Sequence, residues 1–320
     1  MYSKLRAHPE YIGPGTYDRL ARLFMTEGRQ QSASRHPWDI RGHRFNWGER
    51  TYLMGVINVT PDSFSDGGQF TTVDTALKQA ETLVKANIDI LDIGGQSTRP
   101  GAEQISLGEE LNRVVPIIEA IRQADNTSLK QAVISIDTTR ATVARAAIEA
   151  GADIINDVSG ATYEPDILKV AAEKEVPIIL MHLRGTPETM QQMTDYSDLI
   201  GEISTFLRQQ TKQALTVGVP FQNVCIDPGI GFAKTYEQNL EILRQLSALT
   251  ELGSPILVGV SRKSFIGWIL DQPDPQQREW GTAAACTASI AAGADILRVH
   301  STAMADVTRV ADAIWRQVEP

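Results

Sequence analysis

The chain has 320 residues, of which 42% are hydrophobic, so it can bury the core of one large domain. It carries 30 basic and 39 acidic side chains, and this acidic balance argues against a nucleic-acid surface, leaving room only for a local basic pocket. No stretch approaches the ~18 consecutive apolar residues of a membrane span, which argues against a membrane protein.

Two cysteines, Cys225 and Cys286, lie in apolar sequence. They are expected to be buried, reduced thiols, as is usual in a reducing compartment. The first thirty residues contain no apolar core of a signal peptide. These features predict a cytoplasmic protein.

Residues 1–50 are predicted to form an N-terminal extension. Thr16 can cap a short helix, and residues 39–50 favour a hairpin that turns near Gly42. We expect this extension to cover the start of the main domain, residues 51–320, and to carry no chemistry of its own.

From residue 51 onward, strand and helix patterns alternate eight times. Short apolar runs predict strands at 53–58, 88–94, 133–137, 153–157, 176–182, 223–227, 255–260 and 295–300. Amphipathic stretches predict helices at 72–87, 107–124, 139–150, 165–175, 198–218, 236–251, 277–293 and 303–318. Doubly wound sheets usually stop at five or six strands, so eight units predict a parallel (β/α)8 barrel.

The first of these strands runs directly into a loop. Leu53 to Asn58 is apolar and β-branched, and the residues that follow, as far as Gly68, are rich in Gly, Ser, Asp and Pro. A buried strand that delivers a polar residue into such a loop is a common way for α/β proteins to build a site.

Every predicted strand ends in a charged, hydroxyl or amide group. These groups are Asn58, Asp92, Asp137, Asn156 with Asp157, His182, Asp227, Ser261 to Lys263, and Arg298 with His300. One such residue can simply begin a loop. A barrel does not need polar groups at the ends of all eight strands for its stability. Barrel active sites lie at this end of the strands, so we predict a site here.

Part of this predicted site suits a flat heterocycle. Asp137 and Asp227 are acceptors, and the amide of Asn156 both donates and accepts. This combination fits the amino and ring N–H groups of a pterin or a guanine. Lys263 could meet a ring nitrogen or carbonyl, or it could form a Schiff base in an aldolase-type barrel; its neighbours leave both uses open.

A second part of the predicted site is cationic. Arg99, Arg298 and His300 lie near the turn 94–98, whose backbone N–H groups could also hold an anion such as phosphate or diphosphate. Beside such an anion, Asn58 could hold Mg²⁺ through its oxygen, with phosphate and water completing the shell.

At this point the sequence resembles the dihydropteroate synthase family of the folate pathway, a target of sulfonamides. The resemblance is carried in family order by GVINVTPDSFSDGG (55–68), DIGGQSTRPGA (92–102), SIDT (135–138), GADIINDVSG (151–160), LMHLRGTP (180–187), DPGIGFAKT (227–235), GVSRKSFIG (259–267), GTAAA (281–285) and RVH (298–300). Fifty leading residues are too few for an appended pyrophosphokinase domain, so a single activity is expected.

The resemblance implies a transferase that joins 6-hydroxymethyl-7,8-dihydropterin diphosphate to p-aminobenzoate, giving 7,8-dihydropteroate and diphosphate. It implies an SN1-like loss of Mg²⁺-bound diphosphate before the amine attacks. The implied pterin-binding residues are Asp137, Asn156, Met181, Asp227, Phe232 and Lys263. The implied diphosphate-binding residues are Asn58, as the Mg²⁺ ligand, with Arg99, Arg298 and His300.

The resemblance also implies a second substrate site, formed when loops 58–70 and 94–105 close. Phe64, Thr98, Pro100, Arg262 and Ser264 would bind aminobenzoate, with Ser264 receiving its carboxylate at a helix N-terminus. Asp66 would stabilise the developing pterin cation. The implied catalytic residues are thus Asp66, Lys263, Arg298 and His300.

Three residues depart from the family's commonest pattern. Gln96 stands where many members have Glu, Ala233 replaces a usual Gly, and Ser301 replaces a usual Asp. None falls on a residue assigned to the pterin or diphosphate. We expect these changes to affect loop closure and kinetics rather than the activity itself.

The late helix 277–293 is rich in small residues. These allow either tight packing on the barrel or the homodimer interface that the family forms through its late helices.

Two other functions would use the same predicted pterin-binding residues: a corrinoid methyltransferase of the same fold, and a paralogue that binds pterin without turnover. Neither needs the full diphosphate and aminobenzoate set.

Overall fold

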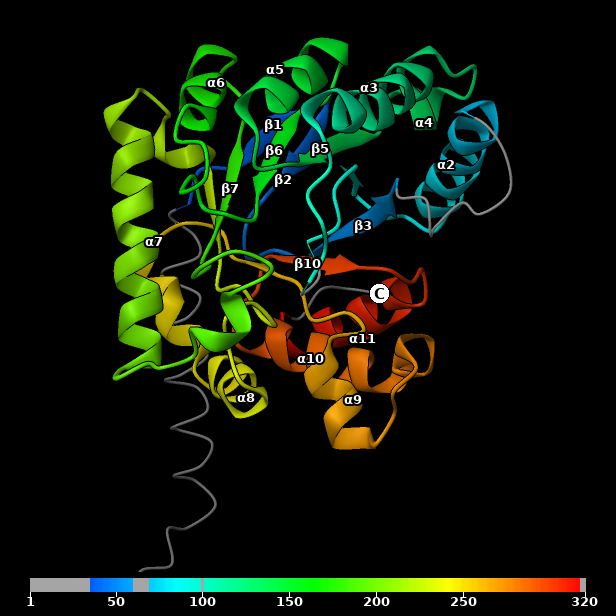
Figure 1. The fold of residues 1–320 in the computed structure, drawn as a ribbon. Coiled ribbons are helices and arrows are strands. Elements are labelled where there is room, and N and C mark those ends of the chain that lie inside the picture. Colours follow the sequence, from blue (N-terminus) through cyan, green and yellow to red (C-terminus); the bar gives the residue numbers. More distant parts are fainter. Residues whose placement is uncertain (1–34, 60–68, 99–100, 317–320) are drawn as a thin grey trace, which may run out of the picture.

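The computed structural model describes residues 35–59, 69–98 and 101–316 (Figure 1). The short helix predicted near Thr16 lies outside these residues. So do four of the predicted site residues, namely Phe64, Asp66, Arg99 and Pro100.

Eight parallel strands form the centre of the molecule (Figure 1). They are β3 (Tyr52–Asn58), β4 (Ile90–Gly94), β5 (Val133–Asp137), β6 (Ile154–Asp157), β7 (Ile178–Met181), β8 (Val224–Asp227), β9 (Leu257–Val258) and β10 (Ile296–Val299). Their order is β8-β7-β6-β5-β4-β3-β10-β9, and a parallel bridge between Ile226 and Ile256 joins the two edges. The predicted (β/α)8 barrel is therefore confirmed.

Helices follow the strands around the outside (Figure 1). They are α2 (Gln69–Lys85), α3 (Leu107–Gln123), α4 (Thr127–Lys130), α5 (Ala141–Ala150), α6 (Ile167–Glu173), α7 (Leu199–Thr216), α8 (Tyr236–Arg244), α9 (Ser264–Leu270), α10 (Glu279–Ala291) and α11 (Met304–Trp315). Short 3₁₀ segments occupy Met190–Gln192, Phe221–Asn223, Leu246–Leu252 and Pro275–Gln277.

The structure differs from the element prediction at four places. The predicted helix 236–251 ends at Arg244 and continues as a 3₁₀ segment. The helices α4 and α9 were not predicted, because four and seven residues are too few to display a 3.6-residue period. Strand β9 has only two paired residues within the predicted 255–260.

Successive side chains along each strand point alternately toward the helices and toward the barrel axis. One set of strand side chains faces the helices and forms the large apolar core between the sheet and the helix ring. The other set faces the barrel axis. Near the amino ends of the strands, this inward set forms one apolar layer, with one residue from each strand: Met54, Ile90, Val133, Ile154, Ile179, Cys225, Leu257 and Ile296.

A hairpin covers this apolar layer. Strands β1 (Trp38–Ile40) and β2 (His43–Phe45) pair antiparallel through a turn at Arg41 and Gly42, both with positive φ, as a two-residue hairpin requires. Trp38 and Phe45, together with Trp47, are buried in the same cluster as the barrel layer. The amino end of the barrel is thus closed, while the division of the chain at residue 50 stays a prediction.

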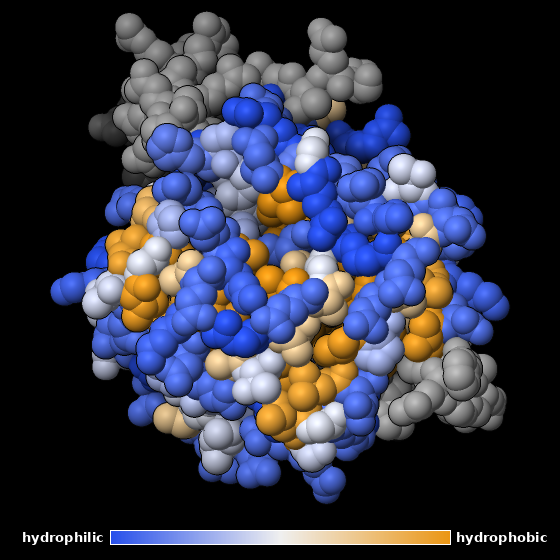
Figure 2. Space-filling model, turned by 90° about the horizontal axis from the view of Figure 1, so that it is seen from above, coloured by the Kyte–Doolittle hydropathy of each residue, from blue (hydrophilic) through white to orange (hydrophobic). Residues whose placement is uncertain are grey.

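Both cysteines are free and buried, Cys225 inside the barrel and Cys286 on α10. Within the described ranges, no helix combines the length and apolarity needed to cross a membrane. The face shown in Figure 2 is largely hydrophilic, with hydrophobic patches between the hydrophilic residues.

Candidate active site

The site begins two residues beyond the apolar layer on each strand. Because strand side chains alternate, moving two residues along keeps the side chain inside the barrel and lifts it by about 7 Å. On this step several inward residues, though not Val56 or Met181, change from apolar to polar. They include Asp92 on β4, Asn156 on β6, Asp227 on β8 and Arg298 on β10.

Arg298 connects these side chains. Its Nε donates to Asp92 Oδ2 at 2.6 Å, and its Nη2 donates to Asp137 Oδ2 at 2.7 Å. Asn156 Nδ2 lies 3.3 Å from Asp92 Oδ2. Sequence reasoning separated a cationic anion site from an acceptor site, but the long Arg298 side chain joins the two inside a narrow barrel.

Asp92 had no assigned role, although it is fully buried at the centre of this network. The prediction placed it at a strand end, whereas it is the middle residue of β4. A usable signal was present, since a carboxylate at an inward position of an apolar strand needs a buried cation or donor.

The carboxylates here differ from surface carboxylates in acidity. Burial raises the pKa of Asp137 to about 7, against the opposing effect of Arg298. Burial likewise raises the pKa of Asp227 to about 6, although Gly229 N donates to its Oδ1 at 2.7 Å. Both groups can therefore change charge near neutral pH.

An apolar wall lies beside these carboxylates. Met181 is buried in a cluster formed by residues after β6, β7 and β8, against which Phe232 packs. Lys263 Nζ stands 4.1 Å from the centre of the Phe232 ring, and burial lowers the pKa of Lys263 to about 8. The combination offers one flat apolar face, with acceptors and a cation at its edge.

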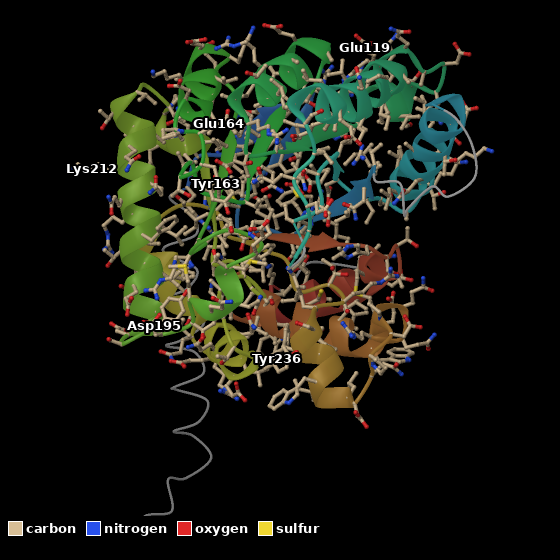
Figure 3. The ribbon with its side chains drawn as sticks, viewed as in Figure 1. Glu119, Tyr163, Glu164, Asp195, Lys212 and Tyr236 are labelled. Atoms are coloured by element: carbon tan, nitrogen blue, oxygen red, sulfur yellow. The ribbon has the colours of Figure 1, made fainter. Side chains whose placement is uncertain are left out.

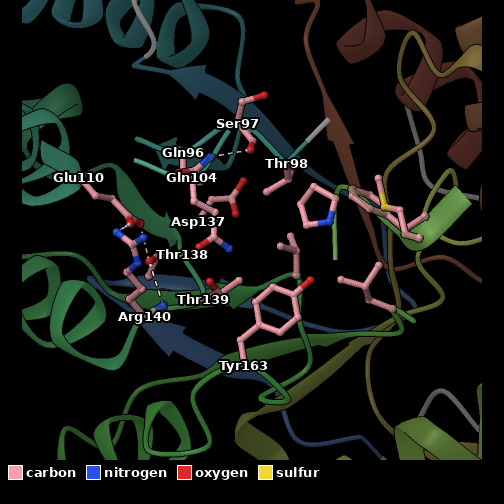
Figure 4. A pocket seen from close by; sticks show the side chains of 15 residues that line it. Gln96, Ser97, Thr98, Gln104, Glu110, Asp137, Thr138, Thr139, Arg140 and Tyr163 are labelled. Atoms are coloured by element: carbon pink, nitrogen blue, oxygen red, sulfur yellow. Dashed lines mark hydrogen bonds and ion pairs between the residues drawn. The ribbon is translucent and has the colours of Figure 1, made fainter. Parts of the chain in front are cut away.

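A pocket opens between this wall and the loop after β4 (Figure 4). Its lining includes Asp137, Phe232 and Thr98. At one side of the pocket, Glu110 accepts from Arg140 at 3.0 Å and from Thr138 Oγ1 at 2.6 Å (Figure 4). The pocket is thus bounded by apolar, hydrogen-bonding and charged groups.

Gln96 fixes the described ends of the loop after β4. Its Nε2 donates to the carbonyls of Ser97 and Glu103 at 2.8 and 2.9 Å, and its Oε1 accepts from Ile105 N at 2.8 Å. A glutamate could not make the two donated bonds, because an ionised carboxylate only accepts. The amide at this position therefore has a structural use.

The other two departures also have visible local consequences. Ala233 is buried with φ of 50°, a left-handed conformation that glycine adopts more readily. Ser301 Oγ accepts from Ala303 N at 3.2 Å, in the turn that leads into α11.

The remaining predicted residues lie around the mouth of the barrel. Asn58 ends β3 beside Gly94. Ser261 Oγ lies 3.0 Å from His300 Nδ1. Ser264 begins α9 and is exposed.

Arg262, predicted to meet aminobenzoate, has φ of 60° and lies 3.8 Å from Glu279 of α10. Its binding role stays a prediction, as do those of the other predicted site residues.

Similarity to known proteins agrees with this geometry. The family model of pterin binding enzymes matches residues 54–300. The dihydropteroate synthase of Synechocystis sp. is 60% identical over 273 residues, which cover 85% of this chain and 93% of that protein.

Two crystal structures have the same fold. The dihydropteroate synthase of Clostridium difficile, determined in the presence of pteroic acid, is 40% identical with a TM-score of 0.79, covering 85% of this chain and 99% of that one. The enzyme of Xanthomonas albilineans with 4-aminobenzoic acid is 39% identical with a TM-score of 0.79, covering 90% and 100%. This chain therefore belongs to the pterin-binding enzyme family, among the dihydropteroate synthases.

Proposed function

We propose that this chain condenses 6-hydroxymethyl-7,8-dihydropterin diphosphate with p-aminobenzoate to give 7,8-dihydropteroate and diphosphate. The observation that carries the proposal is the set of buried Asp137, Asn156 and Asp227 with half-buried Arg298, beside the Phe232 wall. Carboxylates and an amide around a flat apolar face suit a pterin ring. The pteroic acid and 4-aminobenzoic acid in the related crystal structures are ligands of the same kinds.

The pterin would be held by its edge and its face. Asp137, Asn156 and Asp227 would accept from or donate to its polar edge, and Lys263 would meet a ring nitrogen or carbonyl. Met181 and Phe232 would cover the ring face. Because these polar groups are buried, a ligand that does not match them would leave them without hydrogen-bond partners, which costs binding free energy.

The diphosphate would be held by cationic groups at the mouth. Arg298 uses Nε for Asp92 and Nη2 for Asp137. Its remaining nitrogen, Nη1, would donate to the anion. His300, whose ring is oriented by Ser261, would be a second donor, and Arg99 a third.

The reaction then needs little proton transfer at the start. The C–O bond to the diphosphate breaks and the leaving group takes the electron pair. The aniline nitrogen, already nucleophilic, forms the C–N bond and loses one proton. Catalysis is mainly stabilisation of the leaving anion and positioning, with Asp66 stabilising the pterin cation.

Aminobenzoate would bind above the pterin. Thr98 lines the pocket, and Phe64 and Pro100 would join it from the two loops. Ser264 would receive the carboxylate at the start of α9, with Arg262 beside it.

Magnesium would be held at this site mainly by the diphosphate of the substrate rather than by protein side chains. Among the described residues, no group of three or more His, Cys, Asp or Glu side chains is placed to hold a metal. Asn58 offers one amide oxygen at the end of β3, and Mg²⁺ commonly keeps several waters while bound through substrate phosphates. When bound there, it would neutralise charge on the leaving diphosphate.

We also propose a cytoplasmic homodimer that forms through the late helices. Its support is the exposed apolar surface of α10 and α11, where Trp280 is 86% exposed and Val310 61% exposed. Large apolar side chains that gather on neighbouring helices are typical of an interface between proteins. The two free cysteines support a reducing compartment.

The direct test of the activity is an assay with both substrates and Mg²⁺. We expect one diphosphate to be released for each dihydropteroate formed. Pterin binding with no diphosphate release would contradict the proposal and favour a silent paralogue. Methyl transfer from methyltetrahydrofolate to a corrinoid protein would favour the methyltransferase.

A further inference from the structure

Lys234 is a buried lysine two residues after Phe232 of the apolar wall. It follows the loop after β8, and its residue is only 2% exposed. Its Nζ donates to the carbonyl of Phe232 at 2.8 Å and lies 3.0 Å from His182 Nδ1. An amine or ammonium is costly to bury, so its retention inside this loop calls for a use.

His182 is the natural acceptor for this lysine. It follows β7 and is buried, and burial, with Lys234 and Arg184 nearby, lowers its pKa to about 2. The imidazole is therefore neutral, and one of its nitrogens is an acceptor. With Lys234 donating to Nδ1, the ring proton must lie on Nε2.

The same two residues connect the ends of β7 and β8. His182 N donates to the carbonyl of Asp227 at 2.9 Å. Gly229, at φ of 73°, passes so close that a Cβ there would lie 2.1 Å from the His182 carbonyl oxygen and 3.2 Å from Lys234 Nζ. The loop is therefore wrapped around the Lys234 amine.

This loop carries two groups of the proposed pterin site. Asp227 starts it, and Phe232 lies near its end with Lys263 over its ring. Since Lys234 holds the Phe232 carbonyl directly, displacing the lysine would release the backbone that presents the ring.

We propose that Lys234 is a positioning residue for the pterin site, which through its bond to His182 Nδ1 fixes the Phe232 wall against the Asp227 carboxylate. The inference rests on the proposed function, since it assigns Lys234 to the binding of the pterin substrate.

The first test is a spectroscopic one on the intact protein. Burial lowers the pKa of Lys234 to about 7, and the charged groups near it are Asp227, Lys263 and Arg184, so spectra are recorded at pH 6, where the ammonium is present. We expect the ¹⁵N signals of His182 to report the Nε2–H tautomer. A proton on Nδ1 would overturn the inference, because Lys234 could not then donate to that nitrogen.

The second test is the affinity for the pterin substrate. Lys234→Met keeps the length of the side chain but removes its donors. We expect about tenfold or more loss of affinity for 6-hydroxymethyl-7,8-dihydropterin diphosphate by calorimetry, as for loss of a bond to a charged group. His182→Asn, which keeps an acceptor near the Nδ1 position, should retain most of the affinity.

Lys212 on the outer side of α7 supplies the matched control (Figure 3). Lys212→Met should bind like the unaltered protein. If the unaltered protein forms no dihydropteroate, the proposed function fails. If it does, and Lys234→Met still binds the pterin with unchanged affinity, the inference about Lys234 fails.

Discussion

The two ends of this barrel use the same eight strands for opposite purposes. At the amino end, one inward residue of each strand forms an apolar layer, and the Trp38–Phe45 hairpin closes over it. Two residues farther along, the inward positions carry Asp92, Asn156 and Arg298, joined by hydrogen bonds. One step of strand alternation therefore separates the part of the interior that stabilises the fold from the part that we propose binds the pterin.

The largest expected effect comes from removing the central cation. Arg298→Met leaves Asp92 and Asp137 as buried carboxylates with no cation between them. Breaking such a buried pair costs about 3–5 kcal/mol, so we expect lower stability together with almost complete loss of activity. Urea unfolding and kcat/KM measure the two effects. Normal activity in a folded Arg298→Met protein would contradict the proposal that the layer containing Arg298 binds the substrates.

At the amino end, Trp38→Ala should affect stability alone. Trp38 is buried against Trp47 and the lower barrel layer, and removing a large core side chain costs about 3–5 kcal/mol. We expect a lower unfolding midpoint but unchanged KM values at a temperature where the variant is folded. A large change in the KM for the pterin substrate would show that the two ends are coupled.

Asp227→Asn addresses one acceptor of the binding layer. The amide keeps the shape but loses the charge, and a hydrogen bond to a charged group contributes about 1.5–3 kcal/mol. We expect pterin affinity measured by calorimetry to fall by about 10- to 100-fold, with little loss of stability. An unaltered affinity would mean that Asp227 does not anchor the pterin.

The pH dependence of pterin binding tests the same layer without a mutation. Burial raises the pKa of Asp227 to about 6 and that of Asp137 to about 7, so both become ionised and accept hydrogen bonds only as the pH rises through these values. Burial lowers the pKa of Lys263 to about 8, so the cation is lost above that pH. Affinity should therefore be greatest between about pH 7 and 8. Constant affinity from pH 5 to 9 would contradict these roles.

The smallest effect is expected at Ala233. Its left-handed conformation costs about 1–2 kcal/mol for a non-glycine residue, whereas glycine loses about 0.4–1 kcal/mol through its freer unfolded chain. Ala233→Gly should thus raise the free energy of unfolding by at most about 1.6 kcal/mol. The control is Ala144→Gly inside helix α5, which should lower it by about 1 kcal/mol. Equal signs for the two variants would refute the strain at Ala233.

Much of the fold could be predicted because it repeats. Strand β5 was predicted at its observed bounds, and β6 within one residue, since buried parallel strands are short apolar runs between polar loops. Short elements such as α9 give too few residues for a periodic signal. The eightfold repeat identified the barrel even though individual bounds shifted.

The site could be predicted only as far as local sequence reaches. Asp137, Asn156 and Asp227 were selected because they stand at or near the ends of apolar strands, and they do lie inside the barrel near its mouth. Asp92 was included among the polar strand ends but was given no role, and it is the middle residue of its strand. The contact of Arg298 with Asp137 spans 161 positions in sequence, so only the closed barrel brings the two together.

The most direct test of this account is a crystal structure of the protein with 6-hydroxymethylpterin. We predict that the ring lies against Phe232, with its polar edge within hydrogen-bonding distance of Asn156 and Asp227, above the apolar layer. A pterin bound outside the barrel mouth, with these side chains still paired only to one another, would contradict the account.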